Sequence, residues 1–170
     1  MSLSLSEVAL FGILGGMTFA AKVAMAGLAN IEPVSLMVML FAVTFGRKAI
    51  YPIYVYVLME FVLYGFGPWS VNYLYIWLVL AGAAWLLRGM TNPIGWALLS
   101  GIFGLLFGAL CAPVDIFVGG WGYAVTKWMN GILFDVAHCI GNFVMALGLF
   151  VPLRRVLDQL GLPSCQKPRS

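Results

Sequence analysis

The chain has 170 residues, of which 63% are hydrophobic and only 9% are Asp, Glu, Lys or Arg. A soluble domain carries about 25% charged residues, and no soluble fold of this size could bury so much apolar surface. Composition therefore excludes a water-soluble enzyme, a nucleic-acid-binding protein and a disordered protein. It predicts an all-α integral membrane protein with one compact domain, embedded in a lipid bilayer.

Apolar runs separated by glycine, proline and charged residues predict six membrane-spanning helices, because Pro33 and Pro68 cannot continue a preceding helix. The runs are too long and too uniformly apolar for barrel strands. The second and third are shorter than the roughly 20 residues that a bilayer requires, so they are tilted, broken or shielded by neighbours. A five-span alternative makes these two runs one re-entrant hairpin. The six expected ranges are about 6–28, 34–45, 49–65, 71–87, 93–118 and 130–151.

The basic residues predict the orientation of the bundle. If the N-terminus is cytoplasmic, seven of the nine Lys and Arg residues lie on the cytoplasmic side, as the positive-inside rule requires. Only Lys22 and Lys127 lie outside. We therefore expect a compact bundle of six transmembrane helices, residues 1–156, with both termini cytoplasmic and a short cytoplasmic tail, residues 157–170. The seven cytoplasmic residues are Arg47, Lys48, Arg88, Arg154, Arg155, Lys167 and Arg169.

The same topology brings ionisable side chains from separate segments to a similar depth near the outer face. Such side chains are costly inside a membrane, so their gathering indicates a functional site. The alternative is structural, with Lys22 forming an ion pair with Glu60 or Asp135 and contacting no ligand. The ionisable residues at this depth are Lys22, Glu32, Glu60, Asp115, Lys127, Asp135 and His138.

Three polar residues of the sixth predicted helix share one face. Asp135, His138 and Asn142 are spaced i, i+3 and i+7. His138 is the only histidine, so it is either a hydrogen-bonded core residue or a ligand contact. One histidine with dispersed carboxylates is a weak set of metal ligands, and the three cysteines form no Cys-x-x-Cys motif. We expect no metal site and no permanently bound cofactor.

Aromatic residues gather at the same depth. Asn72, Tyr73 and Tyr75 open the fourth predicted helix, and Trp121 lies in a glycine-rich stretch expected to form an outer loop that folds over a ligand. An interfacial aromatic belt is the alternative. Planar rings with a few polar groups suit an organic molecule with a conjugated ring system. The candidate substrate-binding residues are Lys22, Glu60, Asn72, Tyr73, Tyr75, Trp121, Asp135, His138 and Asn142.

Small residues recur every four positions in the first and fifth predicted helices, a pattern that lets another helix approach closely. In the fifth, Gly104, Gly108 and Ala112 are expected to serve internal packing. In the first, the stripe equally suits internal packing or a docking face for a partner protein. Its residues are Gly12, Gly16, Ala20 and Ala24.

No constellation of catalytic residues is evident, and there is no phosphate-binding loop, so we expect a protein that is not an enzyme. Two other functions stay open. Asp135 and His138 could form the acid–base pair of a small intramembrane enzyme. Lys22 and Glu60 could relay protons in a solitary ion-coupled carrier.

The stripe with Ala20 and Ala24, the turn Asn30-Ile31-Glu32-Pro33 and the six short spans resemble the substrate-binding S components of energy-coupling factor (ECF) vitamin transporters. The resemblance covers about residues 8–156. It implies a vitamin site at the outer face and docking through Ala20 and Ala24 on a transmembrane T component. Two cytoplasmic ATPases of the complex would use ATP, and the chain would be a multi-pass protein of the bacterial cytoplasmic membrane.

The resemblance also bears on the substrate. The chain begins Met1-Ser2 and lacks the Met-His arrangement of the nickel and cobalt branch. Gly119-Gly120-Trp121-Gly122, with Asp135 and His138, is similar to a branch associated with cobalamin, which is the expected vitamin. Folate, pantothenate, a pyrimidine precursor and a queuosine precursor are the alternatives.

Overall fold

The computed structural model describes residues 3–28 and 31–160, and within these residues the chain is helical with no strand. By length and composition, four helical segments can cross a membrane: Leu5–Ala24, Val34–Tyr64, Pro68–Leu86 and Pro93–Gln159. The all-α class is thereby confirmed, and the four apolar segments are compatible with a membrane protein. The elements are α1 (Leu5–Ala24), α2 (Val34–Phe45), the 3₁₀ turn η1 (Gly46–Ala49), α3 (Ile50–Tyr64), α4 (Pro68–Leu86), α5 (Pro93–Leu105) and α6 (Phe107–Gln159).

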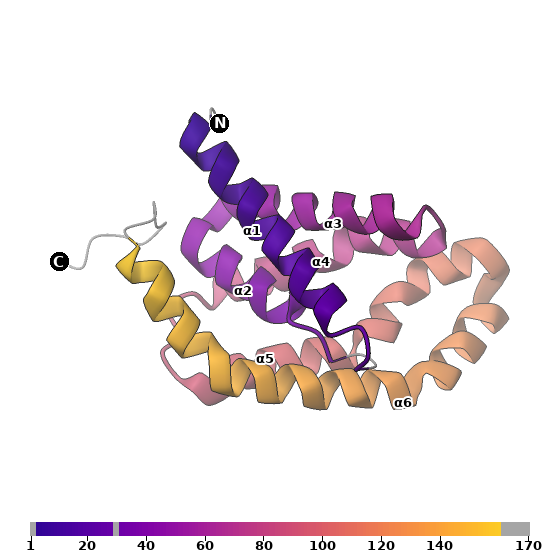
Figure 1. Ribbon diagram of the computed structural model, residues 1–170. Coiled ribbons are helices and arrows are strands. Elements are labelled where there is room, and N and C mark those ends of the chain that lie inside the picture. The colour runs from indigo at the N-terminus through magenta and orange to yellow at the C-terminus, as the bar shows by residue number, and fades with distance from the viewer. Residues whose placement is uncertain (1–2, 29–30, 161–170) are drawn as a thin grey trace.

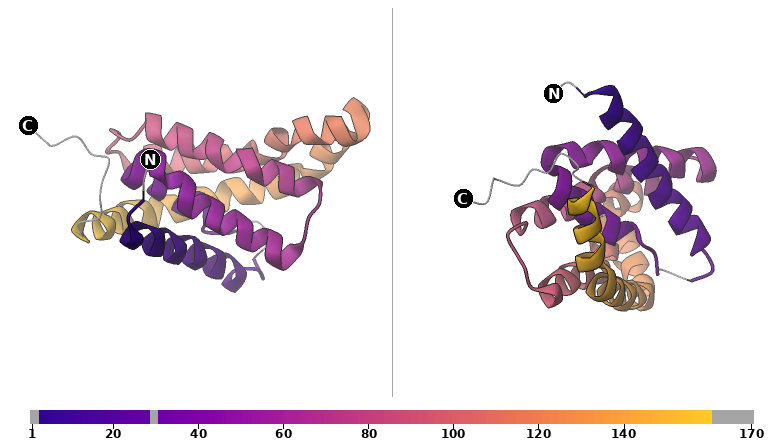
Figure 2. Two further views of the ribbon diagram at one scale, coloured as in Figure 1. Left: turned by 90° about the horizontal axis from the view of Figure 1, so that it is seen from above. Right: turned by 60° about the vertical axis from the view of Figure 1, so that its left-hand side comes forward.

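The helix ends gather at two opposite ends of the bundle (Figure 1). The N-terminus, the α2–α3 junction, the α4–α5 connection and the last turns of α6 lie at one end. The α1–α2 connection, the α3–α4 turn and a sharp bend in α6 lie at the other end, as the view from above in Figure 2 also shows. Because the connections alternate in this way, the chain runs back and forth between the two ends.

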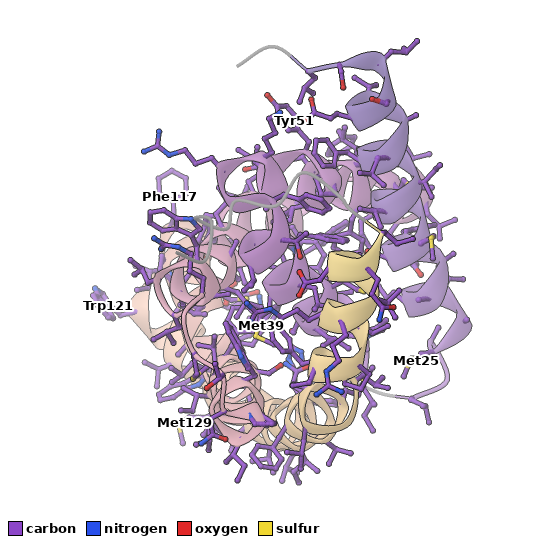
Figure 3. The ribbon with its side chains drawn as sticks, turned by 90° about the vertical axis from the view of Figure 1, so that its left-hand side faces the viewer. Met25, Met39, Tyr51, Phe117, Trp121 and Met129 are labelled. Carbon is purple, nitrogen blue, oxygen red and sulfur yellow. The ribbon has the colours of Figure 1, made fainter. Side chains whose placement is uncertain are left out.

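The glycine-rich stretch expected to form an outer loop is helical, which corrects that prediction. The backbone of α6 leaves helical geometry at Gly120 (φ 79°, ψ 179°), where a positive φ is tolerated because glycine has no Cβ. A helical hairpin therefore replaces the loop, and Trp121 points away from the bundle (Figure 3). The fifth predicted span is also broken, since α5 ends at Leu105 and α6 starts at Phe107.

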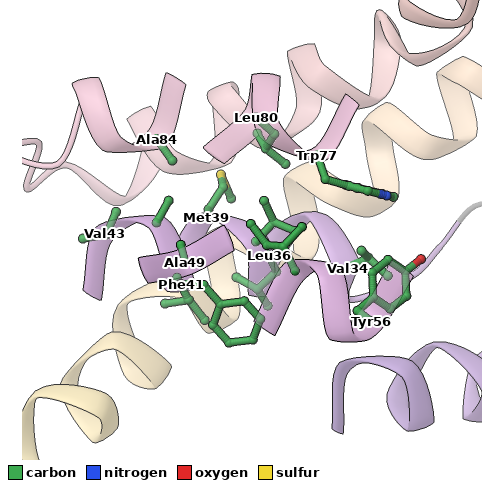
Figure 4. Close-up of a cluster of buried hydrophobic side chains, with 14 of the residues drawn as sticks. Val34, Leu36, Met39, Phe41, Val43, Ala49, Tyr56, Trp77, Leu80 and Ala84 are labelled. Atoms are coloured by element: carbon green, nitrogen blue, oxygen red, sulfur yellow. The ribbon is translucent and has the colours of Figure 1, made fainter. Parts of the chain in front are cut away.

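Helix α2 forms the centre of the core. Eleven of its twelve residues are buried, including Ser35 and Thr44. A helix that is apolar on all sides must be enclosed by protein or lipid, and here protein encloses it. In Figure 4, Leu36 and Met39 of α2 lie between the α3 side chain Tyr56 and the α4 side chains Trp77 and Leu80. This 12-residue helix, shorter than a bilayer requires, is therefore shielded by its neighbours, which was one of the alternatives that the sequence left open.

Small residues bring α5 and the start of α6 against the second half of α6. A Cβ placed on Gly104 would lie 2.8 Å from the backbone of His138, and one on Gly108 would lie 2.5 Å from Asp135 Oδ2. Neither position tolerates a larger side chain without a shift of its neighbours. The stripe with Gly104 and Gly108 therefore serves internal packing, as the sequence predicted.

Candidate functional site

A buried ion pair joins α1 to α3. Lys22 Nζ donates a hydrogen bond of 2.6 Å to Glu60 Oε2, and Glu60 is only 1% exposed. Glu32, in the connection after α1, lies 3.9 Å from the same ammonium group. Of the two pairings considered for Lys22, the structure shows the one with Glu60. Two carboxylates therefore share one lysine.

Three tyrosine rings surround Lys22. Its ammonium group lies 6.0 Å from the ring centre of Tyr56, 5.4 Å from that of Tyr64 and 5.6 Å from that of Tyr73. The negative faces of these rings favour the cation. Burial raises the pKa of Glu32 above its ordinary value, and the charge of Lys22 acts against that rise. Lys22, its two carboxylates and the three tyrosines together offer a ligand hydrogen-bond acceptors and aromatic surface.

A second polar group lies on α6. Asp135, His138 and Asn142 are all buried, at 7%, 4% and 2% exposure, which confirms that they share one inward face. The Gly108 amide donates to Asp135 Oδ1 at 3.1 Å, and this contact depends on the close approach that glycine permits. Asn142 Nδ2 donates to Ser35 Oγ at 3.0 Å and to the Ser100 carbonyl at 3.2 Å. Asn142 thus ties α6 to α2 and α5.

Aromatic rings connect the two polar groups. The ring of Trp77 lies 5.5 Å from Tyr73 and 6.0 Å from Phe107, and Phe107 lies 5.1 Å from the imidazole of His138. Trp77 also meets Tyr56 edge-on at 5.9 Å. A continuous aromatic wall therefore runs from Lys22 on one side to His138 on the other.

Several buried polar atoms beside this wall lack a hydrogen-bond partner within the described part of the chain. They belong to three helices: Glu60 Oε1 on α3, Trp77 Nε1 on α4, and Asp135 Oδ2 and His138 Nε2 on α6. Each such atom costs about 1–3 kcal/mol when left unpaired, so native proteins rarely leave several together. The arrangement can therefore bind a polar molecule that offers both donors and an acceptor.

The remaining candidates divide into those near the wall and one far from it. Tyr73 belongs to the group around Lys22, whereas the Tyr75 hydroxyl donates to Asn72 Oδ1 at 3.1 Å and to the Leu110 carbonyl. Tyr75 thus ties α4 to α6, and Asn72 accepts a hydrogen bond from the same hydroxyl. Trp121 is 73% exposed beside the bend of α6, so the structure does not bring it to the other candidates.

Sequence reasoning missed Phe107 of the wall, and it also missed Tyr56 and Trp77. The last two are fully buried, at 0% exposure. Tyr56 precedes Glu60 by four positions and Trp77 follows Tyr73 by four, so each shares a helix face with a residue that was chosen. That spacing is the signal that could have identified them.

Asp115 and Lys127 lie on the two arms of the α6 hairpin. Lys127 Nζ donates to Asp115 Oδ1 at 2.5 Å, and Asp115 is 3% exposed. This ion pair links the two arms of the hairpin that bends at Gly120. It is separate from the residues around Lys22. Within the described residues, no cluster of three or more His, Cys, Asp or Glu side chains could hold a metal ion.

The stripe of α1 faces outward. A Cβ on Gly12 would meet no atom within 4 Å, and one on Gly16 would meet only Met59 Sδ at 3.9 Å. Ala20 and Ala24 are exposed. Gly15, outside the stripe, makes the close internal contact, since its Cβ would lie 2.6 Å from Val55. Neither glycine of the stripe therefore makes a close helix contact within the chain.

Comparison of the chain with protein-family models, curated proteins and solved structures finds no match in any of the three.

Replacing Lys22 with Met should lower stability, because it leaves the carboxylate of Glu60 buried without its counter-charge. We expect a loss of about 3–5 kcal/mol in the free energy of unfolding, measured by denaturant titration in micelles. The double variant Lys22→Met with Glu60→Gln should recover much of this loss. Lys48→Met is the matched control, since it breaks a more exposed pair with Glu7. Equal losses in both single variants would contradict a special role for the buried pair.

Proposed function

We propose that the chain is the substrate-binding S component of an ECF-type ABC transporter and captures a vitamin at the outer face of the bacterial cytoplasmic membrane. One observation carries the proposal: an apolar bundle holds polar side chains on three helices whose buried atoms lack partners among the described residues. Intramembrane polar residues are retained where they serve a function. Their position beside an aromatic wall favours binding of an organic molecule over ion conduction.

The proposed topology has six spans with both termini in the cytoplasm. Its support is the distribution of positive charge. The segments with Arg47 and Lys48, with Arg88, and with Arg154 and Arg155 all belong to the bundle end that carries the termini (Figure 1). Positive charge concentrates on the cytoplasmic side of membrane proteins. The other two residues expected there, Lys167 and Arg169, lie outside the described residues.

The buried polar atoms without partners indicate which chemical groups the ligand must carry. Glu60 Oε1 and Asp135 Oδ2 accept hydrogen bonds, so the ligand must bring donors such as amide or amino groups, while Trp77 Nε1 requires an acceptor. The rings of Tyr73, Trp77 and Phe107 favour a conjugated system. Cobalamin, with amide groups around a conjugated ring, is our first candidate. Folate and a queuosine precursor also meet both requirements, whereas pantothenate lacks the ring.

The energy for uptake would come from partner proteins. The outward stripe with Ala20 and Ala24 offers a smooth surface on which a helix of a T component can pack closely. Two cytoplasmic ATPases bound to the T component would then hydrolyse ATP. In this proposal the chain itself catalyses no reaction.

Cysteine labelling tests the topology. In a variant without native cysteines, Phe66→Cys in the α3–α4 turn should react with a membrane-impermeant maleimide added to intact cells. Thr91→Cys in the α4–α5 connection should react only after the membrane is opened. Both sites are exposed, so access to solvent is not limited by folding. The reverse pattern would overturn the orientation.

Loss of a ligand-binding carboxylate tests the site. The molecule that co-purifies with the wild-type protein is first identified by mass spectrometry and absorbance. Asp135→Asn should then weaken its binding about tenfold to a hundredfold, because a buried charged hydrogen bond is lost. Asp158→Asn, the same change at an exposed position of the same helix, is the matched control. Wild-type affinity in Asp135→Asn would contradict the assignment.

A bulky ring on the stripe tests docking. Ala20→Trp and Ala24→Trp should abolish vitamin uptake in cells that express the T component and ATPases, because the ring prevents close helix approach. Vitamin binding to the purified variants should stay unchanged. Ile102→Trp on α5, which is also lipid-exposed, is the control. Normal uptake by the stripe variants contradicts docking, and uptake without the ATPases would indicate an ion-coupled carrier.

A further inference from the structure

A second feature of the bundle lies at the end that carries the termini, away from the polar groups described above. There η1, the first turn of α3 and the second half of α4 line an open cavity of about 320 Å³. Ile50 and Leu78 at its edge are 40% and 36% exposed, so the cavity opens onto the outer surface of the bundle. Its lining residues are Gly46, Arg47, Ala49, Ile50, Ile53, Leu78, Ala81, Gly82 and Trp85.

The cavity combines an apolar lining with positive charge. Arg47 is the one charged residue in its lining. Arg88 adds a second charge, since its guanidinium group lies 4.5 Å from the ring centre of Trp85 and donates to the Trp85 carbonyl at 2.9 Å. Neither arginine forms an ion pair with an acidic side chain of the described residues. Lys48, by contrast, is paired with Glu7.

We propose that this cavity is a binding site for an anionic phospholipid, with an acyl chain in the apolar hollow and the phosphate group beside Arg47 and Arg88. Charge complementarity selects this occupant. A basic pocket between transmembrane helices suits an anionic headgroup, and a tryptophan at the same depth is typical of the interface between lipid and water. A zwitterionic lipid would fill the hollow but would carry no net charge for the arginines.

The site is independent of the proposed vitamin site, because it shares no residue with it and lies at the other end of the bundle. Gly82 lines the hollow, so a substitution there places a side chain beside it. No atom lies within 4 Å of the Cβ that a larger residue would add there, so Gly82→Leu introduces its side chain beside the hollow without a clash at Cβ. Gly148 on α6 is equally open and serves as the matched control.

The experiment measures lipid retention by native mass spectrometry. Purified protein is titrated with phosphatidylglycerol and, separately, with phosphatidylcholine that has the same acyl chains. We expect phosphatidylglycerol to bind preferentially, and each of Arg47→Gln and Arg88→Gln to weaken its apparent affinity about fivefold. Gly82→Leu should also remove this preference. Arg155→Gln, an exposed arginine at the same end, and Gly148→Leu should behave as wild type.

Three outcomes would overturn the proposal. Equal binding of the two lipids by the wild-type protein would mean that the hollow accepts any acyl chain. Wild-type selectivity in the double variant Arg47→Gln with Arg88→Gln would show that these arginines do not bind the headgroup. Unchanged binding in Gly82→Leu, with circular dichroism and gel filtration confirming the fold, would place the lipid elsewhere. Vitamin binding, measured on the same samples, reports on the other site and does not affect this interpretation.

Discussion

The enclosure of α2 by its neighbours is the constraint on which the rest of the structure depends. This helix carries apolar residues on every side and spans only 12 residues. It is enclosed mainly by α4 and α6, with smaller contributions from α1 and α3, and these helices bury its side chains. The surrounding helices then pack one side against α2 and expose apolar side chains on the other. Asn142 adds a polar link, since it reaches Ser35 in the first turn of α2.

Around this core, the polar side chains are concentrated where helices approach most closely. Glu60 is paired with Lys22, yet one of its oxygens has no partner, and the same holds for one oxygen of Asp135. In an apolar bundle such atoms reduce stability, so their retention on separate helices indicates a role that packing alone does not supply. The aromatic wall between them offers a surface for stacking. Together these features support the proposed binding of an organic ligand.

Helix α1 combines a close contact within the bundle with a row of small residues that is open to a partner. Gly15 permits the contact with Val55 of α3 that attaches α1 to the bundle. At Gly12, one turn earlier, an added Cβ would meet no atom within 4 Å. The stripe is thus available to a partner without any cost to the fold. At the bundle end with the start of α1, the arginines beside the cavity form a separate surface, the one for which we propose lipid binding.

The sequence by itself determined the helical fold, helices apolar enough to cross a membrane and the inward face of α6, because hydrophobicity and helical periodicity are local properties. Asp135, His138 and Asn142 follow from spacing alone, and so does the placement of small residues in stripes. Tertiary structure decided which stripe is internal and which is open, since Gly12 and Gly104 look alike in the sequence. It also decided that Lys22 pairs with Glu60, that Trp77 joins the wall and that Trp121 does not. Those outcomes depend on how distant segments pack, and the bend at Gly120 depends on a backbone angle that composition does not specify.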